Sequence, residues 1–234
     1  MAADIRNKDG AIRRVWHEIC RFLAVGLVWI FYRVKVYGRE NIPRDGGVLV
    51  LSSHQSFLDP MFCQGWLGRP LYYVPRDTLF VGWWGKVLDS FYTIPINQDQ
   101  PGIKSMRAII EVLKRGRMVC LYPEGARTPD GKIAEIKPGF GLLVRRSGAT
   151  MVPMVIEGIY ERWPRGQKYP KLGGRVGVLY GEPIARSSMS RIDMWQPKQP
   201  HIEVVATFGL LMTAPPLSPS RSVCGRRAAD PPAP

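Results

Sequence analysis

The chain is poor in the residues that mark several common protein classes. Of its 234 residues only four are cysteines, at positions 20, 63, 120 and 224, and no two of them form a C-x-x-C pair. This spacing argues against a cysteine metal site and a dense disulfide framework, so we expect free thiols in a reducing compartment. The basic residues form no long Lys/Arg block, and no zinc-finger spacing or RNA-recognition signature is present, so no nucleic-acid partner is expected.

Acidic residues are scarce as well. Asp and Glu number 19 against 33 Lys and Arg, which gives a formal net charge of +14. Such a charge attracts anions, and an anionic membrane surface is the favoured partner because the chain also has an apolar segment to insert. With 45% hydrophobic residues the chain can bury one sizeable core, and its length favours one domain over two.

The apolar run near the N-terminus, residues 22–32, is too short to cross a bilayer. As a helix it spans about 16 Å, against a hydrocarbon core of about 30 Å. From Ile12 onward apolar residues recur at helical spacing, so an amphipathic helix is predicted to about Tyr32. Its aromatic residues and flanking arginines favour an interfacial helix, with an ordinary core-packing helix as the alternative. A secretory signal is disfavoured because no small-residue cleavage site precedes residues 33–35.

Downstream, short β-branched or aromatic runs alternate with helical patterns, which is typical of an α/β domain whose mainly parallel central sheet is flanked by helices. Strands are predicted at 48–52, 71–74, 91–94, 118–122, 151–156 and 175–180, and helices at 60–67, 79–88, 103–115 and 140–146. A closing helix could cover 201–212. We therefore predict a membrane-associating helical segment at 1–36, an α/β domain at 37–212 and a disordered, Pro-rich tail at 213–234.

The first group of chemistry-bearing residues follows the predicted strand at 48–52. His54 lies just beyond its carboxyl end, and Asp59, near an N-cap, opens the next helix with Pro60. A strand–turn–helix lets the chain fold His54 back onto the Asp59 carboxylate. A neutral imidazole can remove a hydroxyl proton, while the carboxylate fixes its tautomer and stabilises the imidazolium. We predict His54 as a general base oriented by Asp59; a structural His and a capping Asp are the alternatives.

The second group follows the predicted strand at 118–122 and contains Glu124, Gly125 and Arg127. Loops at the carboxyl ends of parallel strands border the ligand crevice, so these residues can face the same crevice as His54. Arg127 offers a planar fork suited to phosphate, and Gly125 lets backbone N–H groups approach it. A solvated arginine in a surface turn is the alternative.

Together these segments resemble the signature blocks of the glycerophospholipid acyltransferase superfamily. S-H-Q-S-F-L-D at 53–59 is similar to the family's N-H-x-S-x-x-D block, and Y-P-E-G-A-R-T at 122–128 is similar to its F-P-E-G-T-R-S block. The segments at 74–80, 94–98, 136–139 and 152–154 resemble its other blocks in order and spacing. The set is specific where one motif alone is not.

The resemblance implies an enzyme similar to 1-acylglycerol-3-phosphate acyltransferase. In that family the His–Asp pair activates a hydroxyl of lysophosphatidic acid against an acyl thioester carried by coenzyme A or acyl carrier protein, so neither a metal nor another cofactor is expected. The family's contacts to the glycerol phosphate carry over to Glu124 and Arg127, with Gly125 shaping the loop. The resemblance adds three further substrate-binding candidates: Arg76, Lys137 and Pro153.

Several positions depart from the family pattern. Ser53 replaces Asn, Ala126 replaces Thr, Arg76 replaces Lys and Gln98 replaces Arg. Because Gln98 lacks a charge that could face the acceptor phosphate, another acceptor such as a lyso-ornithine lipid is an alternative. The third hypothesis is a non-catalytic protein that binds anionic membranes. Since a lysolipid and its product stay in the membrane, the expected location is the cytoplasmic face of a membrane, as a monotopic or peripheral protein.

Overall fold

Strand β2 (Val48–Ser52) lies near the middle of a six-stranded sheet in the computed structural model, which describes residues 10–97, 102–134, 136 and 139–185. Every residue of β2 is buried, as in a strand that is covered on both faces. Val48 and Val50 point into one apolar cluster, while Leu49 and Leu51 point into another. The core therefore lies on both sides of the sheet.

The sheet order is β1-β6-β5-β2-β4-β3. All neighbouring strands are parallel except β5 and β6, which run antiparallel. The other strands are β1 (Arg33–Tyr37), β3 (Leu71–Tyr72), β4 (Met118–Leu121), β5 (Thr150–Glu157) and β6 (Arg175–Tyr180). This arrangement confirms the predicted α/β domain with a mainly parallel sheet.

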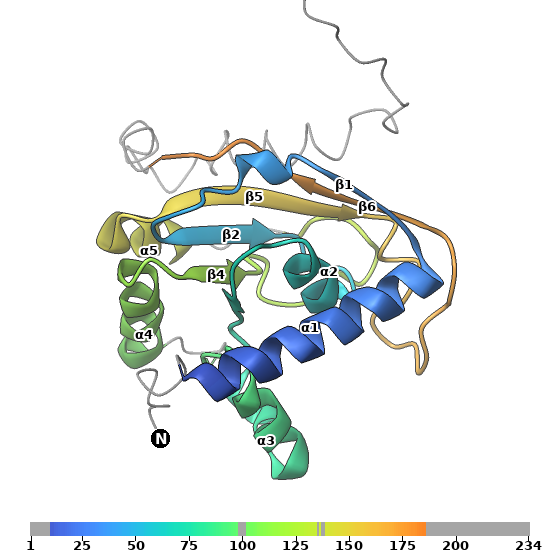
Figure 1. Ribbon diagram of the computed structural model, residues 1–234, viewed down its shortest axis with the longest axis horizontal. Coiled ribbons are helices and arrows are strands. Elements are labelled where there is room, and N and C mark those ends of the chain that lie inside the picture. The colour runs from blue at the N-terminus through green and yellow to red at the C-terminus, as the bar shows by residue number, and fades with distance from the viewer. Residues whose placement is uncertain (1–9, 98–101, 135, 137–138, 186–234) are drawn as a thin grey trace, which may run out of the picture.

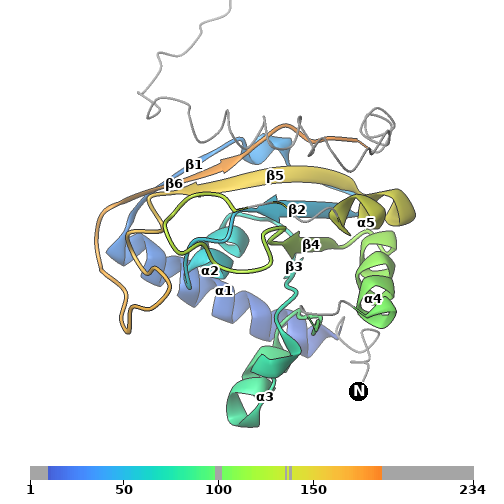
Figure 2. The same cartoon turned by 180° about the vertical axis from the view of Figure 1, so that it is seen from behind.

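Helices flank the sheet in two groups (Figures 1 and 2). They are α1 (Ala11–Phe31), α2 (Asp59–Gly65), α3 (Gly82–Ser90), α4 (Ile103–Lys114) and α5 (Gly139–Ser147), with short 3-10 turns at η2 (Arg39–Asn41) and η3 (Asp77–Leu79). Residues of α4 and α5 pack in the cluster that holds Leu49, and residues of α1 and α2 pack in the cluster that holds Val48. Helix α3 projects from the body beside α1 in both views.

Two predicted elements differ from the observed ones. The segment 91–94 is not a strand: Tyr73 exchanges backbone hydrogen bonds with Tyr92 and Ile94, but only an isolated bridge to Thr93 results. Pro75, two residues after Tyr73, has no N–H to donate to the Ile94 carbonyl, so the ladder is interrupted there and only a second isolated bridge, Arg76 to Ile96, follows. Strand β1 was not predicted, and the predicted boundary at 36/37 falls inside it. The predicted closing helix at 201–212 and the tail at 213–234 lie outside the described residues.

Helix α1 confirms the helix predicted near the N-terminus, and one of its sides packs against the domain. The buried His17 ring contacts the Tyr92 ring edge-on with centroids 4.8 Å apart, and the Tyr32 ring that follows the helix meets Phe62 at 5.8 Å. The opposite side of α1 is exposed and largely apolar. Among the residues that the structure describes, no helix combines the length and the apolarity needed to cross a membrane.

Candidate active site

The turn between β2 and α2 carries the predicted His–Asp pair. His54 follows the carboxyl end of β2, and Asp59 is the first residue of α2, so the helix begins one residue earlier than Pro60, the predicted first helical position. The turn folds back on itself, and His54 Nδ1 lies 2.7 Å from Asp59 Oδ2. The two side chains therefore meet as the strand–turn–helix pattern predicts.

Asp59 is fully buried, and one of its oxygens serves as the anchor of the turn. Oδ2 accepts hydrogen bonds from the backbone N–H groups of Gln55 and Ser56 at 2.8 and 2.9 Å, in addition to the contact with His54. A carboxylate can only accept hydrogen bonds, so the shared proton belongs to Nδ1 of the imidazole. Nε2 is then left with its lone pair available, which is the state that a general base requires.

The plane of the His54 ring is fixed by Tyr122, which follows β4. The two rings stack with centroids 4.0 Å apart and planes 15° apart. Burial raises the pKa of Tyr122 well above its ordinary value, so its hydroxyl stays neutral. The His54 side chain keeps 22% of its surface exposed, whereas its partner Asp59 has none. The imidazole is thus held by a buried support and open on one side.

Glu124 connects the loop after β4 to the backbone of His54. Its Oε1 accepts the His54 N–H at 2.7 Å, and its Oε2 accepts the Ala134 N–H at 2.9 Å. The Thr128 N–H in turn donates to the His54 carbonyl at 2.8 Å, so the two motif segments are bonded on both sides of the histidine. Burial raises the pKa of Glu124, although its two backbone hydrogen bonds act in the opposite direction. In this structure both carboxylate oxygens already have partners.

Gly125 makes the sharp turn that this loop needs. Its φ is 77°, in the left-handed region that favours glycine, and its N–H donates to the Tyr122 carbonyl at 3.0 Å. The chain therefore turns between Tyr122 and Gly125, directly after β4.

Arg127 lies over the ring of Phe57, with its Cζ 3.3 Å from the ring centroid. Phe57 belongs to the same turn as His54, and its ring packs against Trp163 at 5.0 Å. One guanidinium nitrogen of Arg127, Nη1, is buried and has no hydrogen-bond partner in the described part of the chain. Burial lowers the pKa of Arg127, but arginine stays charged at physiological pH. A cation with an unused donor thus stands on the turn that carries the imidazole.

The remaining candidates lie farther from this cluster or cannot be placed. Arg76 is exposed and follows β3, which is two strands away from β2 in the sheet. Pro153 is buried within β5, where it pairs in register with Leu51. Lys137 and Gln98 lie outside the described residues. Their roles in binding stay predictions.

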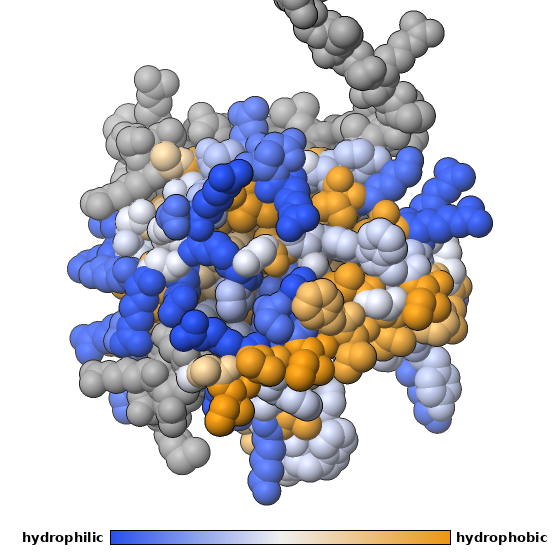
Figure 3. Space-filling view, viewed as in Figure 1, coloured by the Kyte–Doolittle hydropathy of each residue, from blue (hydrophilic) through white to orange (hydrophobic). Residues whose placement is uncertain are grey.

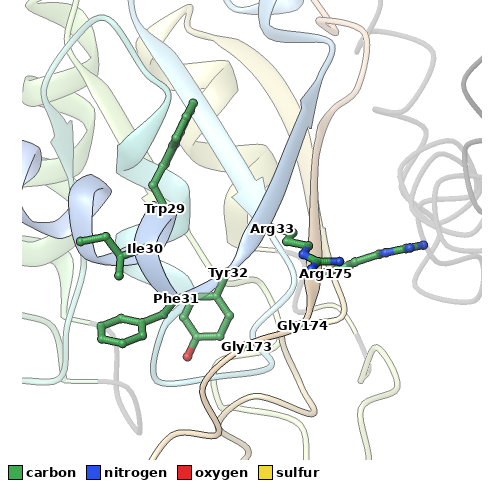
Figure 4. A pocket seen from close by; sticks show the side chains of 8 residues that line it. All are labelled: Trp29, Ile30, Phe31, Tyr32, Arg33, Gly173, Gly174 and Arg175. Carbon is green, nitrogen blue, oxygen red and sulfur yellow. The ribbon is translucent and has the colours of Figure 1, made fainter.

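Within the described residues, neither a candidate metal cluster nor the pocket at the end of α1 coincides with this site. No group of three His, Cys, Asp or Glu side chains that could hold a metal ion occurs within the described ranges. A pocket of about 400 Å³ lies where α1 ends and is lined by residues 29–33 and 173–175 (Figure 4). It contains none of the predicted site residues.

Sequence reasoning missed three aromatic residues of this site. Tyr122 and Phe57 lie inside the two motif segments, so their positions were visible, but nothing in the spacing indicated that they stack on His54 and Arg127. Trp163 comes from the connection between β5 and β6, and its backbone carbonyl accepts a hydrogen bond from the Ser56 hydroxyl at 3.0 Å. No sequence pattern pointed to it.

Comparison with known proteins gives consistent results. Residues 33–157 match the family model described as Acyltransferase. The 1-acyl-sn-glycerol-3-phosphate acyltransferase of Bacillus subtilis is 27% identical over 68% of this chain and 77% of its own length. The enzyme of that name from Pseudomonas aeruginosa is 31% identical, over 72% and 66% respectively.

Longer relatives and a solved structure are also similar. The chloroplastic 1-acyl-sn-glycerol-3-phosphate acyltransferase of Arabidopsis thaliana is 28% identical over 74% of this chain, which spans only 49% of that relative. The crystal structure of the 1-acyl-sn-glycerophosphate acyltransferase PlsC from Thermotoga maritima superposes with a TM-score of 0.65 at 22% identity, covering 89% of this chain and 86% of that one. This structural likeness supports the fold.

Proposed function

The chain belongs to the acyltransferase family, and we propose that it transfers a fatty acyl group from an acyl thioester to the free hydroxyl of a lysophospholipid. Lysophosphatidic acid is the proposed acceptor, because the relatives that match most of this chain are named for that substrate. The observation that carries the proposal is the 2.7 Å contact between His54 Nδ1 and the buried Asp59, with Nε2 left free.

In the proposed reaction His54 acts as the general base. Nε2 takes the proton of the acceptor hydroxyl while the oxygen attacks the thioester carbonyl, and the buried Asp59 carboxylate stabilises the imidazolium. When the tetrahedral intermediate collapses, the carbon–sulfur bond breaks and the imidazolium returns its proton to the thiolate. The products are a diacyl lipid and the free thiol of the acyl carrier. The reaction needs no metal or other cofactor.

Arg127 is the proposed ligand of the acceptor phosphate. Its guanidinium is held on Phe57, three residues after His54, and one of its nitrogens has no partner. An arginine fork binds phosphate oxygens through charge-assisted hydrogen bonds. A phosphate at this point would place the free glycerol hydroxyl toward the imidazole. Gly125 gives the loop its turn, and Glu124 holds that loop against the His54 backbone.

The proposed place of reaction is the cytoplasmic face of a membrane. The outer side of α1 exposes large apolar residues, for example Phe22 at 66% and Leu23 at 64%. A helix of this kind lies in the interface between headgroups and acyl chains. There the enzyme reaches a lipid acceptor without extracting it, while coenzyme A or acyl carrier protein brings the donor from water.

Release of free thiol from an acyl donor, measured with lysophosphatidic acid in detergent, tests this proposal. We expect turnover with the wild-type chain and a loss of about 10²–10⁴-fold in His54→Ala. Parallel reactions with acyl-coenzyme A and acyl carrier protein identify the donor. An unchanged rate in His54→Ala would rule out the assigned base.

A panel of acceptors decides between the alternatives. A preference for a lyso-ornithine lipid over lysophosphatidic acid would replace the proposed acceptor, as the Gln98 substitution allows. Liposome binding without thiol release for any acceptor and donor would instead identify a non-catalytic membrane-binding protein.

A further inference from the structure

Helix α3 and the turn before it expose large apolar side chains. Trp83 is 73% exposed, Val81 72%, Trp84 50% and Leu79 47%. Figures 1 and 2 show α3 standing out from the domain, away from the sheet. A water-soluble surface seldom gathers side chains of this size on one projecting element, and such a patch usually marks an interaction site.

The base of α3 is fastened to α1. Trp16 Nε1 of α1 donates to the Ser90 hydroxyl at 3.2 Å, and the Arg13 guanidinium donates to the Asp89 carbonyl. The buried His17 ring also lies edge-on to Phe91, with centroids 6.4 Å apart. These contacts fix the position of α3 relative to α1.

Helix α1, to which α3 is fastened, also exposes large apolar side chains. Figure 3 shows a hydrophobic band that follows α1 across this face of the molecule. We define the apolar platform as the exposed large apolar residues of α1 and of the segment 79–84: Ile12, Val15, Trp16, Ile19, Phe22, Leu23, Leu27, Trp29, Ile30, Phe31, Leu79, Val81, Trp83 and Trp84. Two basic residues, Arg14 and Lys86, are exposed on the same two helices, beside one exposed acidic residue, Asp89 of α3.

We propose that α3 is a second membrane contact, in which Trp83 and Trp84 enter the headgroup region of an anionic phospholipid bilayer on which α1 also lies. This inference rests on the membrane association proposed above for α1. Tryptophan is enriched at the depth where headgroups meet acyl chains, and nearby Lys and Arg are attracted to anionic lipid. A second copy of the chain would fit less well, because it also carries a net charge of +14.

The second contact has a mechanical consequence. A single helix that lies on a bilayer can roll about its own axis, because all of its contacts lie along one line. Helix α3 projects away from that line, so binding through both elements removes the rolling motion. The domain, and with it the edge of the sheet that carries His54, then keeps one orientation toward the lipid.

Co-sedimentation with vesicles tests the inference. The double variant Trp83→Ser/Trp84→Ser is compared with the wild-type chain on phosphatidylcholine vesicles with and without phosphatidylglycerol. We expect the partition coefficient on the anionic vesicles to fall by at least about tenfold, since the variant lacks the two large apolar side chains that leave water on binding. An unchanged partition coefficient would overturn the proposal.

Two control variants separate this effect from folding and from a general loss of apolar surface. Leu142→Ser removes an exposed apolar side chain (45%) from α5, which is not part of the apolar platform, and should partition like the wild type. Trp83→Phe/Trp84→Phe should retain most of the binding. The proposal is also overturned if Leu142→Ser loses as much binding as the Trp83→Ser/Trp84→Ser variant (the serine pair). If thermal unfolding shows the serine pair to be unfolded, the Trp83→Phe/Trp84→Phe variant decides: a folded phenylalanine pair that binds no better than about a tenth of wild type overturns the proposal.

Two further outcomes are distinct from these. Vesicle binding is measured without an acyl donor, so the proposed catalytic function can fail, with no thiol released, while the difference between the variants persists. Light scattering during size-exclusion chromatography gives the oligomeric state of the wild type and of the serine pair. A change from dimer to monomer in the serine pair, with unchanged vesicle binding, would identify a second copy as the occupant and overturn the proposal.

Discussion

Asp59→Asn is the most informative perturbation of the proposed site, because the structure predicts which part of the aspartate's contribution it removes. The three donors that converge on Oδ2 leave room only for an oxygen at that position. Asparagine would therefore place its carbonyl oxygen there and its amide nitrogen at the position of Oδ1. The Nδ1–H tautomer of His54 should survive and the negative charge is lost, while the amide nitrogen takes the position of the buried Oδ1, which has no hydrogen-bond partner among the described residues.

The expected loss can be worked out from this geometry. A hydrogen bond to a charged group contributes about 1.5–3 kcal/mol, against about 0.5–1.5 kcal/mol for a neutral pair. The difference is about 1–2.5 kcal/mol, so at about 1.4 kcal/mol per factor of ten loss of the charge should lower kcat by roughly 5- to 60-fold. His54→Ala removes the base itself and should cost about 10²–10⁴-fold. Because both residues act on one proton transfer, the double variant should be no slower than His54→Ala alone.

The assay is thiol release under saturating donor and acceptor, with thermal unfolding measured in parallel. Asp59→Ala is the comparison for stability, since it leaves the buried N–H groups of Gln55 and Ser56 without an acceptor. Each such group costs about 1–3 kcal/mol of stability, so Asp59→Ala should unfold at a lower temperature than Asp59→Asn. A loss of kcat in Asp59→Asn as large as that in His54→Ala, in a folded protein, would refute the argument that the backbone donors preserve the tautomer.

Three further predictions concern neighbouring groups. Phe57→Leu removes the ring under Arg127, a contact worth about 0.5–2 kcal/mol, so KM for lysophosphatidic acid should rise by roughly 2- to 30-fold while KM for an uncharged acceptor stays the same; equal effects on both acceptors would contradict a phosphate-binding role. Glu124→Gln should lower kcat more than it raises the acceptor KM, because its carboxylate oxygens already accept backbone N–H groups; a rise in KM alone would instead indicate direct substrate binding. Burial lowers the pKa of His17 below its ordinary 6.5, so the unfolded chain binds the proton more readily and stability should be lost as pH falls below about 6.5. Unfolding temperatures between pH 7.5 and pH 5 should therefore fall less in His17→Phe than in the wild type, and parallel curves would contradict the assignment.

The His–Asp contact could be predicted from the sequence because all of its determinants are local. His54 and Asp59 are five positions apart, and Pro60 indicates where a helix starts. The position of Glu124 could be predicted from the rule that carboxyl ends of parallel strands share one edge of the sheet. Its hydrogen bond to the His54 N–H could not, because spacing carries no information about which backbone donors a buried carboxylate meets.

Periodicity in the sequence could not predict contacts made by irregular segments. Trp163 lies in the connection between β5 and β6, where neither a helical nor a strand period exists, yet it packs against Phe57 beneath Arg127. The same limit explains the strand wrongly predicted at 91–94. Its aromatic and β-branched residues suit a strand, but Pro75 on the neighbouring segment lacks the N–H that would continue the pairing beyond Tyr73, so only isolated bridges form.

The N-terminal helix shows that a periodic apolar pattern does not reveal whether the protein core or a membrane covers the apolar side of a helix. Periodicity predicted α1 and an apolar side, with a membrane or the core as the alternatives, and the structure shows apolar residues on both sides of the helix. The side with Val28 is buried against the domain, while the side with Leu23 is exposed. A helix that is anchored by one apolar side needs no membrane to be stable, so its exposed side is available for lipid at no cost to the fold. That separation is what allows α1 and α3 to form a preassembled surface rather than a segment that folds only on binding.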